Sequence, residues 1–217
     1  PYFIDLEYLC KDKLLTKKEC ESFQWGSNPK YVDYGIMYES RYALLRKVYA
    51  RFTKKEPQDF EKFCENEKQW LDDYALFMAL KDANGGQAWS NWDKSLRLRE
   101  KKAMEEATET YSEEIRFYKM LQYLFYQQWN ALKTYANEAG IEIIGDVPIY
   151  VAGDSADVWA NPDQFYLDEN LEPIEVAGCP PDAFSATGQL WGNPLYDWEY
   201  HKKTGYAWWT RRMANCM

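Results

Sequence analysis

The ionisable side chains of this sequence limit the chemistry that it can perform. His201 is the single histidine, so a Ser-His-Asp triad, a Cys-His pair and a histidine-based zinc site are all disfavoured. No two cysteines have the spacing of a Cys-x-x-Cys motif; they are Cys10, Cys20, Cys64, Cys179 and Cys216. Carboxylates must therefore carry any catalysis. Asp146 is a candidate, because it follows the apolar run Ile141–Ile144 and a glycine.

A helix, a turn and a strand must position Asp146. A long helical pattern begins at Ser112, and Gly140 follows it as a left-handed cap. Its predicted buried face consists of Tyr118, Leu121, Phe125, Trp129, Leu132 and Ala136. The run Ile141–Ile144 then predicts a buried strand, so this order is half of a β/α unit. In barrels of such units, polar groups at the carboxyl ends of strands face the substrate. An equal alternative is that Asp146 opens a turn or caps an amide.

The residues after this strand are rich in turn formers. Asp154 and Ser155 predict the cap of a short helix that extends through Trp159. Residues 165–167 and 173–176 predict a small hairpin. Residues 178–182, Gly-Cys-Pro-Pro-Asp, predict a stiff loop because two prolines fix φ and remove two donors. Such rigid loops usually build binding sites.

Two long runs carry a resemblance to a known family. They are GDVPIYVAGDSADVWANP at 145–162 and VAGCPPDAFSATGQLWGNPLYDW at 176–198, and PYFIDLEYL, VDYG, WLDDYALFMAL and QWNALKTYANEAGI precede them. Together they resemble the amylomaltases, the 4-α-glucanotransferases or disproportionating enzymes of the α-amylase clan (glycoside hydrolase family 77). The resemblance spans almost the whole chain. It implies an α/β fold, a partial (β/α)8 TIM barrel with a large helical insertion subdomain.

The resemblance also implies roles for single side chains. Asp146 would be a supporting carboxylate at the end of the third barrel strand, not the nucleophile. A loop at this place arches over the cleft in the family, with an aromatic ring near the acceptor subsites. The implied substrate-binding residues are Tyr38, Asp182, Phe184, Gln189, Trp191 and Asn193. Tyr38 would belong to a secondary glucan site, whereas its helical neighbours Tyr42, Leu45, Tyr49 and Phe52 predict a core stripe. From the residues alone, a buried scaffold role is favoured for Trp159 and stays open for Trp191.

The catalytic pair of the family has no counterpart in this sequence. Retaining enzymes use a nucleophilic carboxylate and an acid/base carboxylate about 5 Å apart. In the family the nucleophile lies in an Arg-Ile-Asp-His-type motif downstream, and no Arg-Ile-Asp segment occurs here. We therefore expect an internal, N-terminal-half fragment of a larger 4-α-glucanotransferase, inactive by itself. The alternatives are a noncatalytic α-glucan-binding or interaction fragment, and a chain without function whose unpaired strand promotes aggregation.

The composition agrees with a carbohydrate partner. A net charge of −9 argues against binding to nucleic acid or anionic membranes. Aromatic residues form 18% of the chain and can stack on glucose rings, although most are expected in the core. The expected partners are α-1,4-glucans, maltooligosaccharides, glucose and the missing remainder of the barrel. Retaining chemistry requires no metal or cofactor, and none is expected. No signal peptide or long apolar run occurs, which predicts a cytoplasmic protein with reduced thiols.

A change in composition predicts the domain boundary near Gly140. All but four of the 26 Lys and Arg residues precede Gly140, and seven of the 11 Gly residues lie from Gly140 onward. We predict a mainly helical insertion subdomain with a barrel-flanking helix over 1–139. Residues 140–217 would form a barrel strand, an active-site loop segment and the start of the next helix.

Overall fold

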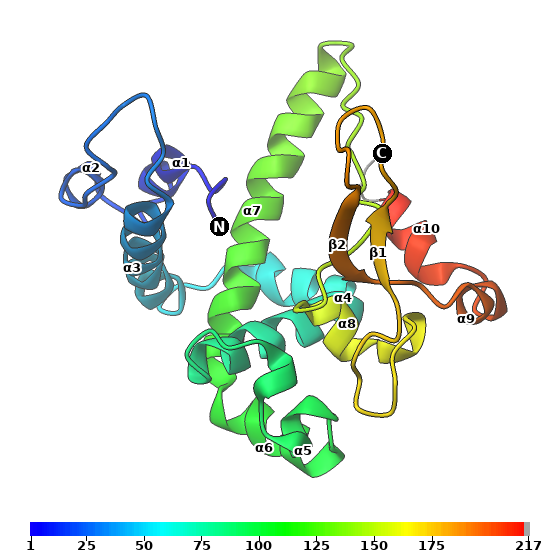
Figure 1. The fold of residues 1–217 in the computed structure, drawn as a ribbon. Helices are drawn as coiled ribbons and strands as arrows, with labels where there is room; N and C mark the ends of the chain where they lie inside the picture. Colours follow the sequence, from blue (N-terminus) through cyan, green and yellow to red (C-terminus); the bar gives the residue numbers. More distant parts are fainter. Residues whose placement is uncertain (215–217) are drawn as a thin grey trace. The chain divides into compact units, whose positions relative to one another are not determined.

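The computed structural model describes residues 1–214, which form two compact units (Figure 1). Unit 1 comprises residues 1–75 and 113–140, and unit 2 comprises residues 76–112 and the chain from 141 onward. One boundary therefore falls directly after Gly140, but residues 76–112 group with the C-terminal part. The division into an insertion subdomain and a barrel part stays a prediction.

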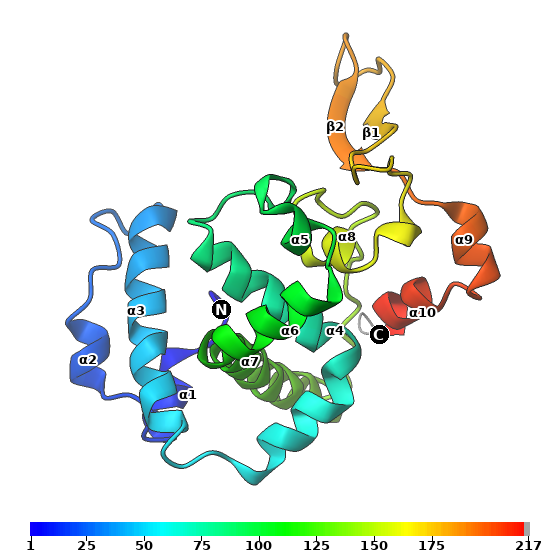
Figure 2. The same ribbon diagram turned by 90° about the horizontal axis from the view of Figure 1, so that it is seen from below.

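Unit 1 is built from helices that begin at side-chain caps. The Asp5 side chain caps α1 (Leu6–Lys11), and Asp33 caps α3 (Tyr34–Phe52). Between them, Thr16 caps α2 (Lys17–Glu21) and forms a capping box with Glu19. Helices α1 and α2 both lie beside α3 (Figures 1 and 2). Helix α4 (Gln58–Ala83) up to Ala75 and most of α7 (Ser112–Glu138) complete the unit.

The core of unit 1 is an aromatic cluster between α3, α4 and α7. The ring of Phe60 lies 5.0 Å from Phe52 and 5.3 Å from Tyr123, both in edge contacts. Polar groups surround this cluster, since Arg116 pairs with Glu56 at 2.6 Å and Tyr123 donates to Asp59 at 2.8 Å. Burial of Leu45, Tyr49 and Phe52 confirms the predicted core stripe of α3 at these positions.

The buried face predicted for α7 is confirmed only in its N-terminal half. Tyr118 and Leu121 are buried, whereas Leu132 is 54% exposed and Tyr135 is 74% exposed. Of the positions predicted to be buried, Leu132 is therefore wrong, whereas Trp129 and Ala136 are half-buried. A periodic apolar face shows that a helix has a side on which other elements can pack. The face is buried only where another part of the structure does pack on it.

Unit 2 has a core around Trp159. Helix α4 ends before Gly85 and Gly86, which both have positive φ, and η1 (Trp89–Asn91), α5 (Lys94–Arg97) and α6 (Lys101–Thr110) follow. Ser155 then caps α8 (Ala156–Ala160), as the sequence predicts, and η2 (Pro162–Gln164) follows. The ring of Trp159 on α8 lies 5.8 Å from Phe77 and 5.7 Å from Trp92. Trp159 is fully buried, in agreement with a scaffold role.

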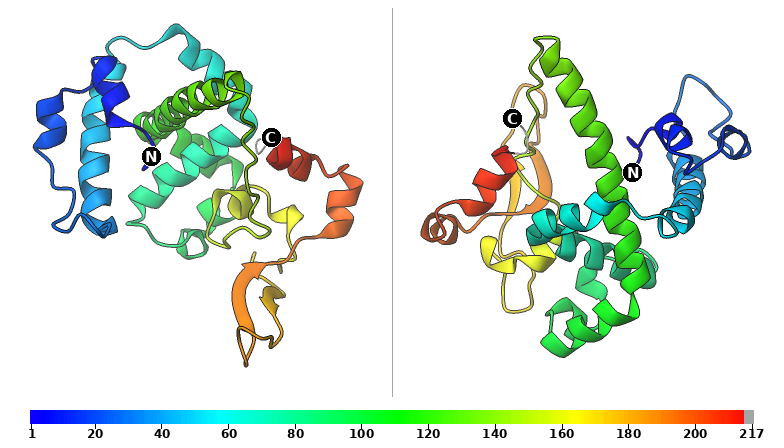
Figure 3. Two further views of the ribbon diagram at one scale, coloured as in Figure 1. Left: turned by 90° about the horizontal axis from the view of Figure 1, so that it is seen from above. Right: turned by 180° about the vertical axis from the view of Figure 1, so that it is seen from behind.

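The only sheet among residues 1–214 is an antiparallel hairpin in unit 2. Strand β1 (Val176–Cys179) pairs with β2 (Gln189–Pro194), with Cys179 opposite Gln189. Helices α9 (Trp198–Lys203) and α10 (Ala207–Ala214) follow β2. The hairpin extends away from α8 and α9 in each view (Figures 2 and 3).

Two strand predictions need correction. In the part of the chain that the structure describes, residues 141–144 form no strand, and Ile144 is 87% exposed. The predicted partial barrel is therefore not seen as paired strands, because a strand requires hydrogen-bonding neighbours and residues 1–214 supply none here. The predicted hairpin at 165–176 reduces to one bridge, Leu167 with Pro173, closed by the amide of Asp168 donating to Glu172. None of the described helices is long and apolar enough to span a bilayer.

Candidate functional site

The hairpin of β1 and β2 carries most of the predicted substrate-binding residues. Its two strands approach so closely that two positions require glycine. A Cβ on Gly178 would lie 2.5 Å from the carbonyl oxygen of Gln189, and one on Gly188 would lie 2.6 Å from that of Cys179. Gly188 also has a φ of +73°, which side-chain-bearing residues rarely adopt. The sequence therefore fixes a narrow, twisted ribbon at this place.

Asp182 organises the tip of the hairpin. Its Oδ1 accepts hydrogen bonds from the backbone amides of Phe184 at 2.9 Å and Ser185 at 2.8 Å. The Ser185 hydroxyl donates to the carbonyl of Gly188 at 2.8 Å, which closes the turn. One carboxylate oxygen of Asp182 thus holds the loop in shape. A substrate-binding role for Asp182 stays a prediction.

Phe184 projects from this ordered tip into solvent. Its side chain is 96% exposed, the highest value among the large exposed hydrophobic residues. Each Å² of apolar surface that stays in water forgoes about 25 cal/mol of the stabilisation that burial would give. An exposed phenyl ring on an ordered turn is therefore unfavourable for the stability of this chain. Such a ring is suited to contact with the apolar face of a ligand.

Trp191 and Gln189 form a second polar and aromatic pair on β2. The indole Nε1 of Trp191 donates to Oε1 of Gln189 at 3.0 Å. The Trp191 ring is 47% exposed and lies 6.2 Å from the ring of Tyr150. The sequence left open whether Trp191 is buried scaffold. In the structure about half of its surface is available to solvent. The indole hydrogen bond fixes its orientation.

The base of the hairpin is fastened to the segment that follows Asp146. Asn193 donates from Nδ2 to the carbonyl of Val151 at 2.8 Å, and the Tyr196 hydroxyl donates to the carbonyl of Ile149 at 2.9 Å. The rings of Tyr150 and Tyr196 stack 5.9 Å apart. One N–H of the Asn193 side chain therefore holds the base of the hairpin, and a substrate-binding role for the rest of this amide stays a prediction.

The structure brings some of the predicted site residues into one unit and leaves one apart. Asp146 is exposed and belongs to unit 2, as do Asp182, Phe184, Gln189, Trp191 and Asn193. Tyr38 belongs to unit 1, on α3, where its ring is 46% exposed and lies 4.5 Å from Tyr42. An exposed tyrosine ring is compatible with the predicted secondary glucan contact, which stays a prediction.

Sequence reasoning missed the residues that support this site. Tyr150 and Tyr196 join the two segments, but neither lies in a pattern that marks it as a contact. His201 is 1% exposed, and its Nε2 lies 3.2 Å from the carbonyl oxygen of Gln164. Burial lowers the pKa of His201. Its role is to pack among the rings of Tyr196, Trp198 and Trp208, since it lies in the interior of unit 2.

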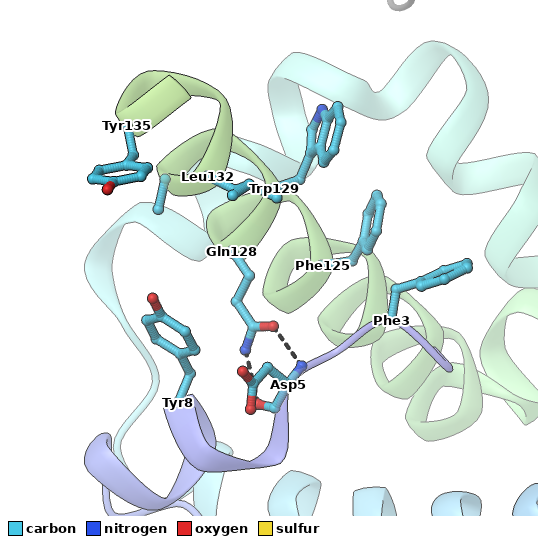
Figure 4. A pocket seen from close by; sticks show the side chains of 9 residues that line it. Phe3, Asp5, Tyr8, Phe125, Gln128, Trp129, Leu132 and Tyr135 are labelled. Atoms are coloured by element: carbon cyan, nitrogen blue, oxygen red, sulfur yellow. Dashed lines mark hydrogen bonds between the residues drawn. The ribbon is translucent and has the colours of Figure 1, made fainter. Parts of the chain in front are cut away.

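Unit 1 contains a hollow surface of different character. A groove of about 840 Å³ lies between the start of the chain and α7 (Figure 4). Its lining is mainly aromatic and aliphatic: Phe3, Asp5, Tyr8, Phe125, Gln128, Trp129, Ala131, Leu132 and Tyr135. Gln128 accepts from the Asp5 amide at 2.6 Å and donates to its carbonyl at 3.2 Å, so these polar groups satisfy one another. This groove resembles a protein-packing surface more than a sugar site.

No candidate metal centre emerges from residues 1–214, because they contain no group of three or more His, Cys, Asp or Glu side chains that could hold an ion. The hairpin and the segment around Asp146 present exposed carboxylates, amides and aromatic rings. These groups fit a neutral polyhydroxy ligand, which hydrogen bonds at its rim and stacks through its ring faces.

Comparisons with known proteins agree with this chemistry. The chain is 49% identical to a 4-alpha-glucanotransferase of Clostridium butyricum and 46% identical to one of Thermus thermophilus, in each case over 100% of this chain but only 45% and 43% of the relative. The structure superposes on an amylomaltase of Streptococcus agalactiae, solved in complex with acarbose, with a TM-score of 0.94 and 40% identity. That match covers 99% of this chain and 44% of the amylomaltase. The chain thus spans less than half the length of these relatives.

The sequence profile of one family matches residues 1–217 throughout, and that family is described as 4-alpha-glucanotransferase. The match includes the segment from Asp146 to the base of the hairpin and the helices of unit 1. This chain therefore belongs to the 4-α-glucanotransferases of glycoside hydrolase family 77.

Proposed function

We propose that this chain is part of a 4-α-glucanotransferase, which transfers α-1,4-linked glucan segments to glucose or another glucan by a retaining double displacement. Membership of the family and the names of the relatives support this proposal. The observation that carries it is the hairpin tip, where Asp182 orders a turn that holds Phe184 96% exposed.

The proposed role of the hairpin is to favour sugar over water as acceptor. Transferases and hydrolases of this kind share a glycosyl-enzyme intermediate, and acceptor binding together with exclusion of water decides which nucleophile reacts. Phe184 and Trp191 would supply apolar ring faces for glucose units. Gln189 and Asn193 would contribute amide groups beside them, and Asp146 would act as a supporting carboxylate.

The groups that break and form the glycosidic bond are proposed to lie outside this sequence. Retaining transfer needs a nucleophilic carboxylate and an acid/base carboxylate. We assign neither to a residue here, so the purified 217-residue chain should release no glucose from maltotriose above a boiled control. Binding of maltooligosaccharides without transfer would favour the alternative of a glucan-binding fragment.

The remainder of the barrel is the proposed partner of the apolar surfaces. Ile144 and the α7 groove around Leu132 are exposed in this chain, and the relatives have more than twice its length, since it covers 45% and 43% of them. Packing of further barrel elements on these surfaces would remove apolar area from water. The partners beyond the polypeptide are α-1,4-glucans, maltooligosaccharides and glucose. A cytoplasmic location is proposed because Cys10, Cys20, Cys64 and Cys179 are all free thiols.

A chimaeric enzyme tests the proposed function directly. Residues 1–217 replace the matching segment of the Clostridium butyricum relative, and glucose release from maltotriose is measured. We expect transfer activity in the chimaera. Its absence in a folded chimaera would contradict the proposal.

Phe184→Ala in the same chimaera tests the acceptor role. Loss of ring stacking worth about 0.5–1.5 kcal/mol should raise the ratio of hydrolysis to transfer several-fold, to at most about 10-fold. Ile174→Ala is the matched control, because Ile174 is also an exposed apolar residue of unit 2, at 63%. An unchanged ratio in Phe184→Ala would remove Phe184 from the acceptor site.

A further inference from the structure

Two of the free cysteines lie in direct contact. The Sγ atoms of Cys10 and Cys20 are 3.8 Å apart, and both residues are partly buried. Formation of an S–S bond of about 2.05 Å would bring the two sulfur atoms roughly 1.8 Å closer, a displacement within the range of a χ1 adjustment. Each cysteine is the penultimate residue of its helix, Cys10 in α1 and Cys20 in α2.

The backbone around this pair is held by independent contacts. The carbonyl of Cys20 accepts from the indole Nε1 of Trp25 at 2.9 Å. Glu19 is clamped by Arg51, with Nη2 and Oε1 2.6 Å apart, and the same guanidinium donates to the carbonyl of Leu14 at 2.8 Å. Helix α1 is held at its start, where Gln128 accepts from the Asp5 amide at 2.6 Å and donates to the Asp5 carbonyl at 3.2 Å. The two thiols therefore face each other because both helices are held by contacts of their own.

The other described cysteines lack such an arrangement. Cys64 is buried on α4 and Cys179 lies on β1. Cys216 lies outside the described residues.

We propose that Cys10 and Cys20 form a reversible intramolecular disulfide when the protein meets a low-molecular-weight disulfide such as oxidised glutathione. One cysteine thiolate attacks a sulfur of the oxidant, which forms a mixed disulfide and releases one glutathione thiolate. The second cysteine thiolate attacks the protein sulfur of this mixed disulfide and releases the second glutathione. The two cysteine protons pass to the two glutathione thiolates, so two protein thiols are oxidised and one glutathione disulfide is reduced.

The chemistry of Cys20 determines how readily this bond forms. Burial, together with the contact to Cys10, raises the pKa of Cys20 to about 11. Cys20 is therefore a thiol at neutral pH, and the pair stays reduced unless an oxidant persists. The closed bond would tie α1 to α2 across residues 10–20.

A non-reducing tryptic digest tests the proposal. Trypsin cleaves after Lys11, Lys18 and Lys30, so the linked product joins peptides 1–11 and 19–30. After incubation with oxidised glutathione, we expect this product, a mass decrease of two hydrogen atoms and the loss of two of the five thiols. Dithiothreitol should reverse all three changes.

Matched variants separate this pair from general oxidation. Cys10→Ser and Cys20→Ser should give no linked product, whereas Cys64→Ser and Cys179→Ser should give it in full. The wild-type digest needs no variant, so the test holds even if a serine variant fails to fold. Absence of the linked product in the folded wild-type protein would overturn the proposal, as would an equal yield when oxidation is carried out in urea.

Discussion

Trp159 and Trp191 allow the scaffold and ligand roles of tryptophan to be separated by stability measurements. Both lie in unit 2 and both donate an indole hydrogen bond, but Trp159 is 0% exposed and Trp191 is 47% exposed. Trp159 donates to the carbonyl of Leu96 at 3.0 Å, and the Arg99 guanidinium lies 4.2 Å from its ring centroid. Removal of Trp159 thus affects a packed core, whereas removal of Trp191 affects a half-open surface.

The magnitude of the effect follows from these contacts. Trp159→Ala loses ring burial worth about 3–5 kcal/mol, and the lost hydrogen bond adds about 1 kcal/mol. We expect the free energy of unfolding of unit 2 to fall by about 5 kcal/mol. Trp159→Phe keeps most of the ring and should lose about 2 kcal/mol. Trp191→Ala removes a half-exposed ring and should cost at most about 1.5 kcal/mol.

Urea unfolding followed by far-ultraviolet circular dichroism measures these differences. Hydrogen exchange of the amides of α5 gives a local control, because Leu96 in α5 accepts the Trp159 hydrogen bond. In the chimaera, Trp191→Ala should lower transfer to sugar acceptors and should lower the unfolding midpoint much less than Trp159→Ala does. Equal destabilisation by Trp159→Ala and Trp191→Ala would refute the distinction between the two roles.

Three further predictions concern backbone and charge. Gly188→Ala should destabilise the hairpin by about 1–3 kcal/mol and weaken acceptor use in the chimaera, since its Cβ would lie 2.6 Å from a carbonyl oxygen at positive φ; a wild-type acceptor profile would contradict this. Hydrogen bonds from Arg51 and then Thr16 lower the pKa of Glu19 from 4.5 to about 2, so the stability due to this pair is present above pH 4.5 and is lost as the pH falls through about 2. Glu19→Gln should flatten the acid unfolding curve in that window. Burial lowers the pKa of His201 below 6.5, so the unfolded state takes up the proton first and stability declines as the pH falls below 6.5. His201→Gln should remove this decline. If the thermal midpoint of the variant falls with pH as steeply as that of the wild type below pH 6.5, His201 is not the cause.

Local signals in the sequence predicted the helix boundaries well. The Ser155 cap was predicted in this way. The capping box of Thr16 and Glu19 and the break at Gly85 and Gly86 likewise depend on neighbours within a few residues. Such interactions can be read directly from spacing. The start of α7 at Ser112 was predictable for the same reason.

Features that depend on distant partners were less predictable. The apolar pattern of Ile141–Ile144 is the same whether or not another strand pairs with it, and here no described residue does. Residues 178–182, which include the end of β1, were predicted as a loop, because the pairing of β1 with β2 depends on a register between residues ten or more positions apart. Resemblance to a family supplied the candidate residues of the hairpin, but their hydrogen bonds, such as Asn193 to Val151, came only from the structure.

The discontinuity of unit 1 has a consequence for biosynthesis. Residues 1–75 leave the ribosome well before residues 113–140, and the contact of Asp5 with Gln128 joins positions 123 residues apart. In the nascent chain, α1 and α3 therefore form before α7 is available to pack on them. Until then the apolar side chains of Leu44, Phe52 and their neighbours are exposed to solvent. Contacts of high sequence separation slow folding, and exposed apolar surface recruits chaperones during translation. Synthesis of α7 is thus the step at which this part of the growing polypeptide gains protection from misassembly.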